Sequence, residues 1–256
     1  GICIKSGRDK AGRDRAMPTE NVIIRRSVVY HAHGGFVIGS EMSGGARNIW
    51  VEDCSFIGTD IGLRFKTKRG RGGVVENIFI KHINMVGIPG EAILFDMYYE
   101  AVDPIPLLGD EKEPIKVVKL PVTEETPQFK NFTIKNVHVN GADKGIFFRG
   151  LPEMHVKNVS LENINIQANK GIEIIASTNI SLKNVRVNTE NTNPLVQVVD
   201  SEGITFDKLT PMSPVELLMR VSGSESKNIR ATGTNFKDVK TKSAFDRGAT
   251  SKALTM

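Results

Sequence analysis

The chain has 256 residues, of which 39% are hydrophobic and 24 are glycine. That is enough to bury a substantial core within one elongated domain. The net charge of +5 favours polyanionic partners, which include nucleic acid, anionic lipid and acidic polysaccharide. We expect no nucleic-acid partner, because the basic residues are interleaved with 29 acids and the common nucleic-acid motifs are absent. No stretch is long and apolar enough to cross a bilayer, so we expect no membrane partner.

The two cysteines, Cys3 and Cys54, are too few for a disulfide framework, and no CxxC pair points to a metal. We expect both to be small buried hydrophobes, with no metal and no cofactor. The chain opens inside an apolar run and has neither an initiator methionine nor a visible signal peptide. We interpret it as a fragment truncated at its N-terminus.

Internal repeats dominate the sequence, in segments that begin with asparagine. Their starts are 21 to 29 residues apart, except for one interval of 54 residues, which is either two repeats or one repeat plus an insertion. In chain order the segments are NVIIRRSVV from Asn21, NIWVEDCSF from Asn48, NIFIKHINM from Asn77, NFTIKNVHV from Asn131, NVSLENINI from Asn158, NISLKNVRV from Asn179, a weaker GITFDKL from Gly203, and NIRATGTNF from Asn228.

Within each segment the apolar residues stand one, three, six and eight positions after the first residue. Steps of two indicate strands, and the single step of three indicates a bend between two short strands. The bend position, five after the start, holds Asn136, Asn163, Asn184 and Gly233, residue types that tolerate a left-handed backbone. A third apolar run follows about 14 positions after each start. The pattern predicts an all-β fold, a parallel β-helix with three strands per coil.

Stacked coils also place equivalent residues in columns. The repeated asparagines are expected to form a ladder in which each amide bonds to the next coil, roughly 4.8 Å away. Between residues 98 and 128 the pattern is interrupted by a segment rich in proline and charge. This insertion is either a loop on the binding face or a tolerated surface loop. After Asn228 the repeat decays, and from about residue 240 we expect a frayed end or a cap. We treat residues 1–256 as a single domain.

Two segments carry the candidate chemistry, His31 to Glu41 and, one coil later, Gly62 to Thr67. They resemble two signatures of glycoside hydrolase family 28, the polygalacturonases: a Gly-His-Gly block running into Gly-Ser, and an Arg-Ile-Lys block. The opening residues 2–7 resemble the strand that follows the family's Asp-Asp pair. Ala32 and Phe65 depart slightly from the family pattern. The family's fold is a right-handed parallel β-helix, in agreement with the repeat.

Aligning Ile4-Lys5-Ser6 with Ile38-Gly39-Ser40, and these with Phe65-Lys66-Thr67, predicts one face that presents histidine and then two cations. The family is an inverting hydrolase of α-1,4-linked galacturonic acid in pectin. The resemblance implies that His33 is catalytic and tunes the acid, and that Arg64 and Lys66 bind the substrate's carboxylate. The alternative is that Arg64 and Lys66 only line a solvent-exposed face, because they alternate with the apolar residues Leu63 and Phe65.

Two further residues are predicted to contact substrate. Lys5 is expected to line the cleft, and Tyr98 to lie against a sugar ring, although the Tyr98–Tyr99 pair could equally cover the core. The resemblance implies three catalytic aspartates, which we place upstream of residue 1. Asp53 does not replace them because it sits in a bend, and Asp60 does not because it is on the wrong coil. The chain alone is therefore expected to be inactive.

The rival interpretation is a β-helix module that binds acidic polysaccharide without catalysis. A lyase is weaker, because no calcium cluster of acids is evident. The sequence leaves open which pectic polymer is bound and whether action is endo or exo, although the insertion from Asp103 to Pro127 favours a blocked cleft and exo action. We expect the parent protein to be secreted or periplasmic, and an uncapped N-terminal end to cause self-association.

Overall fold

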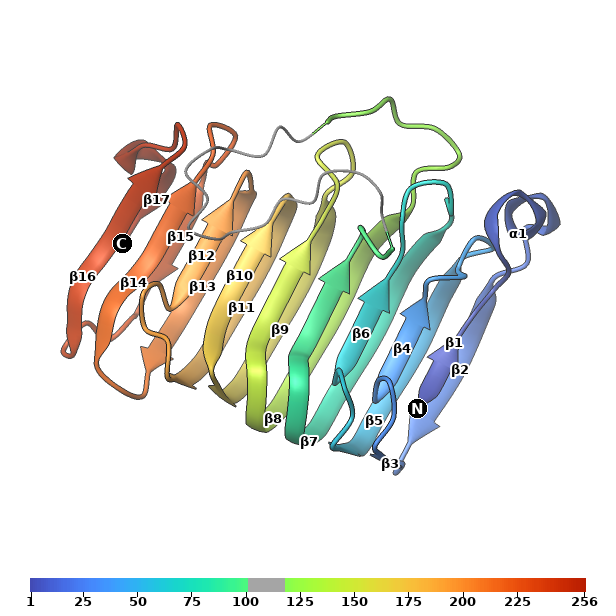
Figure 1. Cartoon of the computed structure of the whole chain (residues 1–256), viewed down its shortest axis with the longest axis horizontal. Coiled ribbons are helices and arrows are strands. Elements are labelled where there is room, and N and C mark those ends of the chain that lie inside the picture. Colours follow the sequence, from blue (N-terminus) through green and yellow to red (C-terminus); the bar gives the residue numbers. More distant parts are fainter. Residues whose placement is uncertain (101–117) are drawn as a thin grey trace.

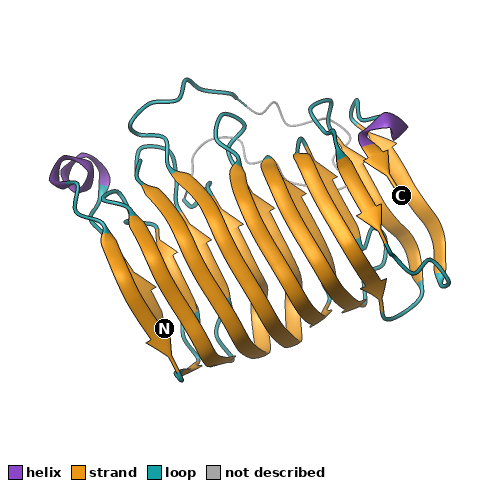
Figure 2. Cartoon of the chain, turned by 180° about the vertical axis from the view of Figure 1, so that it is seen from behind, coloured by secondary structure: helices purple, strands orange, loops and turns teal. Residues whose placement is uncertain are grey.

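The repeat folds into coils stacked along one long axis, as Figures 1 and 2 show from opposite sides. The computed structural model describes residues 1–100 and 118–256. Strand pairing is parallel throughout the described strands. The fold is thus the predicted parallel β-helix.

The strands form two continuous rows. The first row, here called the first sheet, contains β1 (Ile2–Ile4), β4 (Phe36–Gly39), β6 (Leu63–Lys66), the end of β7 (Val74–Asp96), the end of β8 (Gln128–Arg149), β10 (Lys170–Ile175), β12 (Val196–Val199), β14 (Val215–Ser222) and β16 (Val239–Asp246). The second row contains β2 (Thr19–Arg25), β3 (Val28–Tyr30), β5 (Ala46–Ile57), the first parts of β7 and β8, β9 (Val156–Ala168), β11 (Ser177–Thr189), β13 (Glu202–Pro211), β15 (Ile229–Thr232) and β17 (Leu254–Thr255).

The two short strands predicted for each repeat are joined into one bent strand in the middle coils. The bend lies where the spacing placed it, since Asn136, Asn163, Asn184 and Gly233 all have positive φ. The first asparagine of each segment has positive φ as well, between 54° and 59°. Each repeat therefore turns at two left-handed residues, and asparagine adopts that conformation at low cost.

The predicted asparagine ladder is present. Side-chain amides connect Asn21, Asn48, Asn77, Asn131, Asn158 and Asn179 in sequence, at donor–acceptor distances of 3.0 to 3.4 Å. A shorter second ladder joins the bend residues, with Asn184 donating to Asn163 at 2.8 Å and Asn163 to Asn136 at 3.0 Å. Each ladder gives hydrogen-bond partners to side-chain amides at the sharp turns, which lie outside the strand pairing.

Stacked phenylalanines fill the core of the middle coils. Ring centroids of Phe65, Phe95 and Phe148, which occupy one inward column of the first sheet, lie 4.5 and 4.4 Å apart. Phe132 of the second row packs edge-on against Phe65 and Phe95. The core runs as one cluster from Ile4 to Ala253.

The 54-residue interval is one repeat plus an insertion, because Ile78 pairs directly with Phe132. Most of that insertion, including the part of the Asp103–Pro127 segment up to residue 117, lies outside the described residues. Residues 118–127 form a loop without strands. No helix among the described residues is long and apolar enough to span a membrane.

Three features go beyond the sequence expectations or differ from them. The helix α1 (Asp9–Arg15) has no apolar period that predicts it, and contacts with the loop at residues 69–71 hold it in place. The segment after residue 239 forms β16 and β17, separated by the short helix η1 (Ser251–Ala253), as a further rung of the stack. Cys54 is buried as expected, but the prediction for Cys3 is wrong, because it faces outward and is exposed.

Candidate functional site

The register of β1, β4 and β6 brings the predicted site residues to one face of the first sheet. Ile4 pairs with Ile38 and Ile38 with Phe65, as the alignment of the three segments predicted. Arg64 and Lys66 therefore point outward from β6. His33 lies in the loop that leads into β4, one coil before them.

Asp60 holds the imidazole of His33. The Nδ1 atom of His33 lies 2.5 Å from Oδ2 of Asp60, and both side chains are more than half exposed. The two loops are stacked, since the amide of Asp60 donates to the carbonyl of Ala32 at 2.8 Å. With the proton on Nδ1 shared with Asp60, Nε2 is the nitrogen left to face a ligand.

The sequence interpretation rejected Asp60 only as a replacement for the catalytic aspartates, and it did not predict the contact of Asp60 with His33. Equivalent positions in adjacent coils are neighbours, and the 27 residues between His33 and Asp60 equal one repeat. That spacing was the available signal.

Arg64 and Lys66 are the two cations of the site. Arg64 donates from Nη1 to the carbonyl of His33 at 3.0 Å, which fixes its side chain against the histidine loop. Among the described residues neither cation has a carboxylate within ion-pair distance. Two unneutralised cations side by side can bind a carboxylate, and the guanidinium can do so with two parallel hydrogen bonds.

The tyrosine beside these cations is Tyr99, not Tyr98. The Nζ atom of Lys66 is 3.8 Å from the ring centroid of Tyr99, and Cζ of Arg64 is 5.8 Å from it. Tyr98, the residue proposed from sequence, is only 2% exposed and has its ring against Arg69 and Arg149. Of the two alternatives for this pair, the structure places Tyr98 over the core and Tyr99 at the site.

Lys5 lies in the same outward column as Lys66, with Gly39 between them. Gly39 has φ +91°, and a Cβ there would meet the carbonyl of Lys66 at 2.1 Å, so only glycine fits. Lys5 is not a free cation, because its Nζ is 2.5 Å from Oε2 of Glu41. That hydrogen bond raises the pKa of Lys5 and lowers the pKa of Glu41.

Three carboxylates at the described site have basic partners. Asp60 is held by His33, Glu41 by Lys5, and Asp96 by Arg149 at 2.8 Å. Among the described residues no group of three or more histidine, cysteine or acidic side chains could hold a metal ion. The described arrangement can bind an anion and position an imidazole, and it lacks a pair of free carboxylates.

Two other histidines, His82 and His155, have structural surroundings. His82 replaces asparagine at the bend position and lies 3.0 Å from Asp53 of the preceding coil. His155 is 2.8 Å from the hydroxyl of Thr178, and burial lowers its pKa.

Comparisons with known proteins agree with the fold. Residues 2–124 match the model of glycosyl hydrolases family 28. A probable polygalacturonase of Vitis vinifera is 38% identical over 85 residues, which are 33% of this chain and 17% of that protein. A polygalacturonase of Ralstonia solanacearum is 30% identical over 158 residues, covering 57% of this chain and 26% of that protein. The crystal structure of an exopolygalacturonase from Thermotoga maritima superimposes with a TM-score of 0.61 at 28% identity, over 75% of this chain and 39% of that one.

The fold is therefore a right-handed parallel β-helix of the polygalacturonase kind. The match over residues 2–124 and the similarity to polygalacturonases support a relation of this chain to glycosyl hydrolases family 28. The chain spans between 17% and 39% of the length of the three relatives named here.

Proposed function

We propose that this chain belongs to a pectin-degrading glycoside hydrolase that acts on α-1,4-linked galacturonic acid with inversion. The observation that carries the proposal is a pair of cations, Arg64 and Lys66, that have no carboxylate partner among residues 1–100 and 118–256 and lie next to the His33–Asp60 pair on one face. A polymer of galacturonic acid presents one carboxylate per sugar, and these two cations suit such a group. Tyr99 supplies an aromatic face beside them.

Each residue has a distinct role in this proposal. Arg64 and Lys66 bind the carboxylate of a sugar next to the scissile bond. Asp60 orients His33, so that Nε2 faces the reacting groups and tunes the acid that protonates the leaving oxygen. Lys5 lines the same cleft. Inversion needs a second carboxylate that activates water, with the two carboxyl groups about 6.5–9.5 Å apart.

The polypeptide of residues 1–256 by itself is proposed to be inactive. The three carboxylates at the described site are each engaged by a base, so no free acid and base pair is formed there. The catalytic aspartates that the family resemblance implies do not match any residue of this chain.

The test is release of reducing sugar from polygalacturonate, measured for the 256-residue chain and for the longest chain that its gene encodes. We expect release by the longer chain only, with the β-anomer as first product in a proton NMR time course. Arg64→Ala in the longer chain should raise KM strongly. Release by the 256-residue chain would show that the assignment of the catalysts is wrong.

A non-catalytic module that binds acidic polysaccharide is the second candidate. The pairing of Asp60 with His33 and of Asp96 with Arg149, beside cations that are free of carboxylate partners within the described residues, favours binding over hydrolysis. Binding of polygalacturonate without hydrolysis by the longest chain would establish this alternative.

Two subsidiary proposals accompany the function. Because pectin lies outside cells, the parent protein is proposed to be secreted or periplasmic.

The 256-residue polypeptide is proposed to self-associate through β2 and β3, where Ile23, Val28 and Tyr30 are 64%, 54% and 62% exposed. A monomer in light scattering would contradict the second point.

A further inference from the structure

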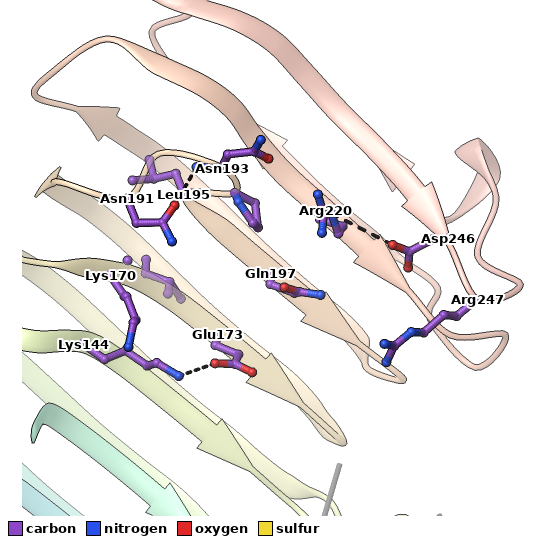
Figure 3. A pocket seen from close by; sticks show the side chains of 13 residues that line it. Lys144, Lys170, Glu173, Asn191, Asn193, Leu195, Gln197, Arg220, Asp246 and Arg247 are labelled. Carbon is purple, nitrogen blue, oxygen red and sulfur yellow. Dashed lines mark hydrogen bonds and ion pairs between the residues drawn. The ribbon is translucent and has the colours of Figure 1, made fainter. Parts of the chain in front are cut away.

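A polar pocket lies on the first sheet, well along the stack from His33 and Arg64. Its volume is about 570 Å³, and its floor is formed by β10, β12 and β14. Figure 3 shows its charged and amide side chains, with Lys170 toward one end and Arg247 at the other. The chemically active lining consists of Lys144, Lys170, Arg220 and Arg247, the acids Glu173 and Asp246, and the amides of Asn191, Asn193 and Gln197.

The pocket repeats the position of the candidate site farther along the same face. In the first sheet Arg64 pairs with Leu94, Leu94 with Phe147, and Phe147 with Glu173. The same column continues through Gln197 to Arg220. Asn191 and Asn193 come from the loop that precedes β12, which corresponds to the His33 loop before β4.

The two sites are nonetheless separate. The outward residues between them, Leu94 and Phe147, are apolar and only 6% and 8% exposed, so they offer little surface for contact. At roughly 4.8 Å per coil, Glu173 is about 14 Å and Arg220 about 24 Å along the axis from Arg64. A single sugar cannot occupy both sites.

The charges of the pocket favour an anion but are not uniformly positive. Lys144 is paired with Glu173, and Arg220 has a loose contact of 4.0 Å with Asp246. Lys170 pairs with Asp143 at 3.1 Å, at a position where both side chains are exposed. Arg247 has no ion pair with any described residue. The lining therefore carries four cations against two acids.

This mixture fits an acidic sugar better than a densely charged anion. Arg247 at one end of the pocket and Lys170 at the other can each bind a carboxylate, whereas hydroxyl groups need both donors and acceptors. Gln197 and Asn193 offer amides that do both, and Glu173 and Asp246 accept hydrogen bonds from hydroxyls. The two acids would repel a phosphate or sulfate polymer.

We propose that this pocket is a second saccharide site, which binds a carboxylate-bearing sugar of an acidic polysaccharide apart from the candidate active site. The ligand class rests on the proposed function. A polymer bound at both sites would be retained more strongly than a short oligomer, because the second contact becomes intramolecular.

The experiment is calorimetric titration of trigalacturonate into the 256-residue chain and into three double variants. The pocket variant is Lys170→Ala with Arg247→Ala, and the site variant is Arg64→Ala with Lys66→Ala. The matched control, Lys227→Ala with Arg230→Ala, removes the same two residue types from the exposed part of the second row. Circular dichroism and melting temperature check that each variant is folded.

We expect two binding sites in the unaltered chain and in the control. The site variant should keep one binding site, which is the pocket. A combined variant with all four substitutions should bind trigalacturonate at that remaining site at least tenfold more weakly. Unchanged stoichiometry and affinity in the pocket variant would overturn the proposal while leaving the proposed function intact. Inorganic phosphate or neutral maltotriose binding as tightly as trigalacturonate would also overturn it, because the site would then not select acidic sugars.

The two proposals fail separately. If the pocket binds trigalacturonate but the longest encoded chain releases no sugar from polygalacturonate, the result counts against the hydrolase. The proposal of a second saccharide site then stands. No trigalacturonate binding by any form would overturn both.

Discussion

At the scale of single residues, asparagine has two physical tasks in this chain. It adopts positive φ at the turns, and its amide bonds to the asparagine of the next coil. Asn158 does both, since it donates to Asn131 at 3.0 Å and accepts from Asn179 at 3.3 Å. Glycine could perform the first task only, and alanine neither.

We therefore expect Asn158→Ala to be more destabilising than Asn158→Gly. Loss of the two exposed amide bonds should cost about 1–2 kcal/mol in either variant. The positive φ should add about 1 kcal/mol for alanine. Urea unfolding measures both values, and equal costs for the two variants would show that the backbone conformation contributes nothing.

The contact of Asp60 with His33 is a second interaction that acts at the scale of single residues. The carboxylate accepts from Nδ1 in the proposed arrangement, so the Nδ1–H tautomer should dominate when the imidazole is neutral. In Asp60→Ala the population of this tautomer should fall, as read from the two ring ¹⁵N chemical shifts of His33. An unchanged tautomer ratio would mean that Asp60 does not orient the ring, and His82 in the same spectrum is the control.

At the scale of the element, the phenylalanine stack holds the middle coils together. Phe95 is fully buried between Phe65 and Phe148, at centroid distances of 4.5 and 4.4 Å. Phe95→Ala should lower the free energy of unfolding by about 3–5 kcal/mol through lost contacts and the cavity left behind. Phe95→Leu keeps much of the volume and should cost clearly less. Guanidinium unfolding of both variants checks this, and similar costs would mean that the cavity is not the cause.

A buried ion pair joins two loops of the stack. Arg69 binds Glu153 through two hydrogen bonds of 2.6 and 2.8 Å, and the Glu153 side chain is only 2% exposed. The same glutamate accepts from the amide of Leu120, so the pair also anchors the described end of the insertion. Burial alone would raise the pKa of Glu153, but the hydrogen bonds from Arg69 and from backbone amides, together with the charge of Arg69, outweigh it and leave the pKa lowered.

A lowered pKa in the folded state means that ionised Glu153 stabilises the fold above its unfolded pKa of about 4.3. That contribution is lost as pH falls through the lower folded value. We expect Glu153→Gln to reduce the free energy of unfolding by about 3 kcal/mol at pH 7. The difference should shrink in acid, where the native side chain is also neutral. A pH-independent difference would exclude the ion pair as its origin.

At the scale of the whole molecule, each coil is stabilised mainly by the coils on either side. The middle coils are paired on both sides and contain the aromatic stack, whereas β1 to β3, β16 and β17 are each paired on one side only. Amide hydrogen exchange should therefore be slowest in β7 to β9 and fastest in the outer strands. Mass spectrometry of the exchanged chain tests this, and uniform protection would indicate that the stack unfolds as one unit.

Much of the fold follows from the sequence because a solenoid is periodic. The step of two and the step of three locate the strands and bends, and the asparagines at the turns meet because their spacing equals one coil. The cation pair could be placed on one face for the same reason. The helix α1 could not be predicted from the sequence, because it has no apolar period and depends on contacts between Arg13, Arg71 and the neighbouring loops.

Periodicity by itself thus determined the parallel β-helix, the register of the first sheet and the shared face of His33, Arg64 and Lys66. Only the tertiary structure decided which side chains meet across coils. It paired Asp60 with His33, exchanged Tyr98 for Tyr99 at the cations, and enclosed a polar pocket between β10 and β16. The physical reason is that strand spacing fixes the positions of backbones, whereas loop stacking and side-chain rotamers, which are not periodic, fix the contacts.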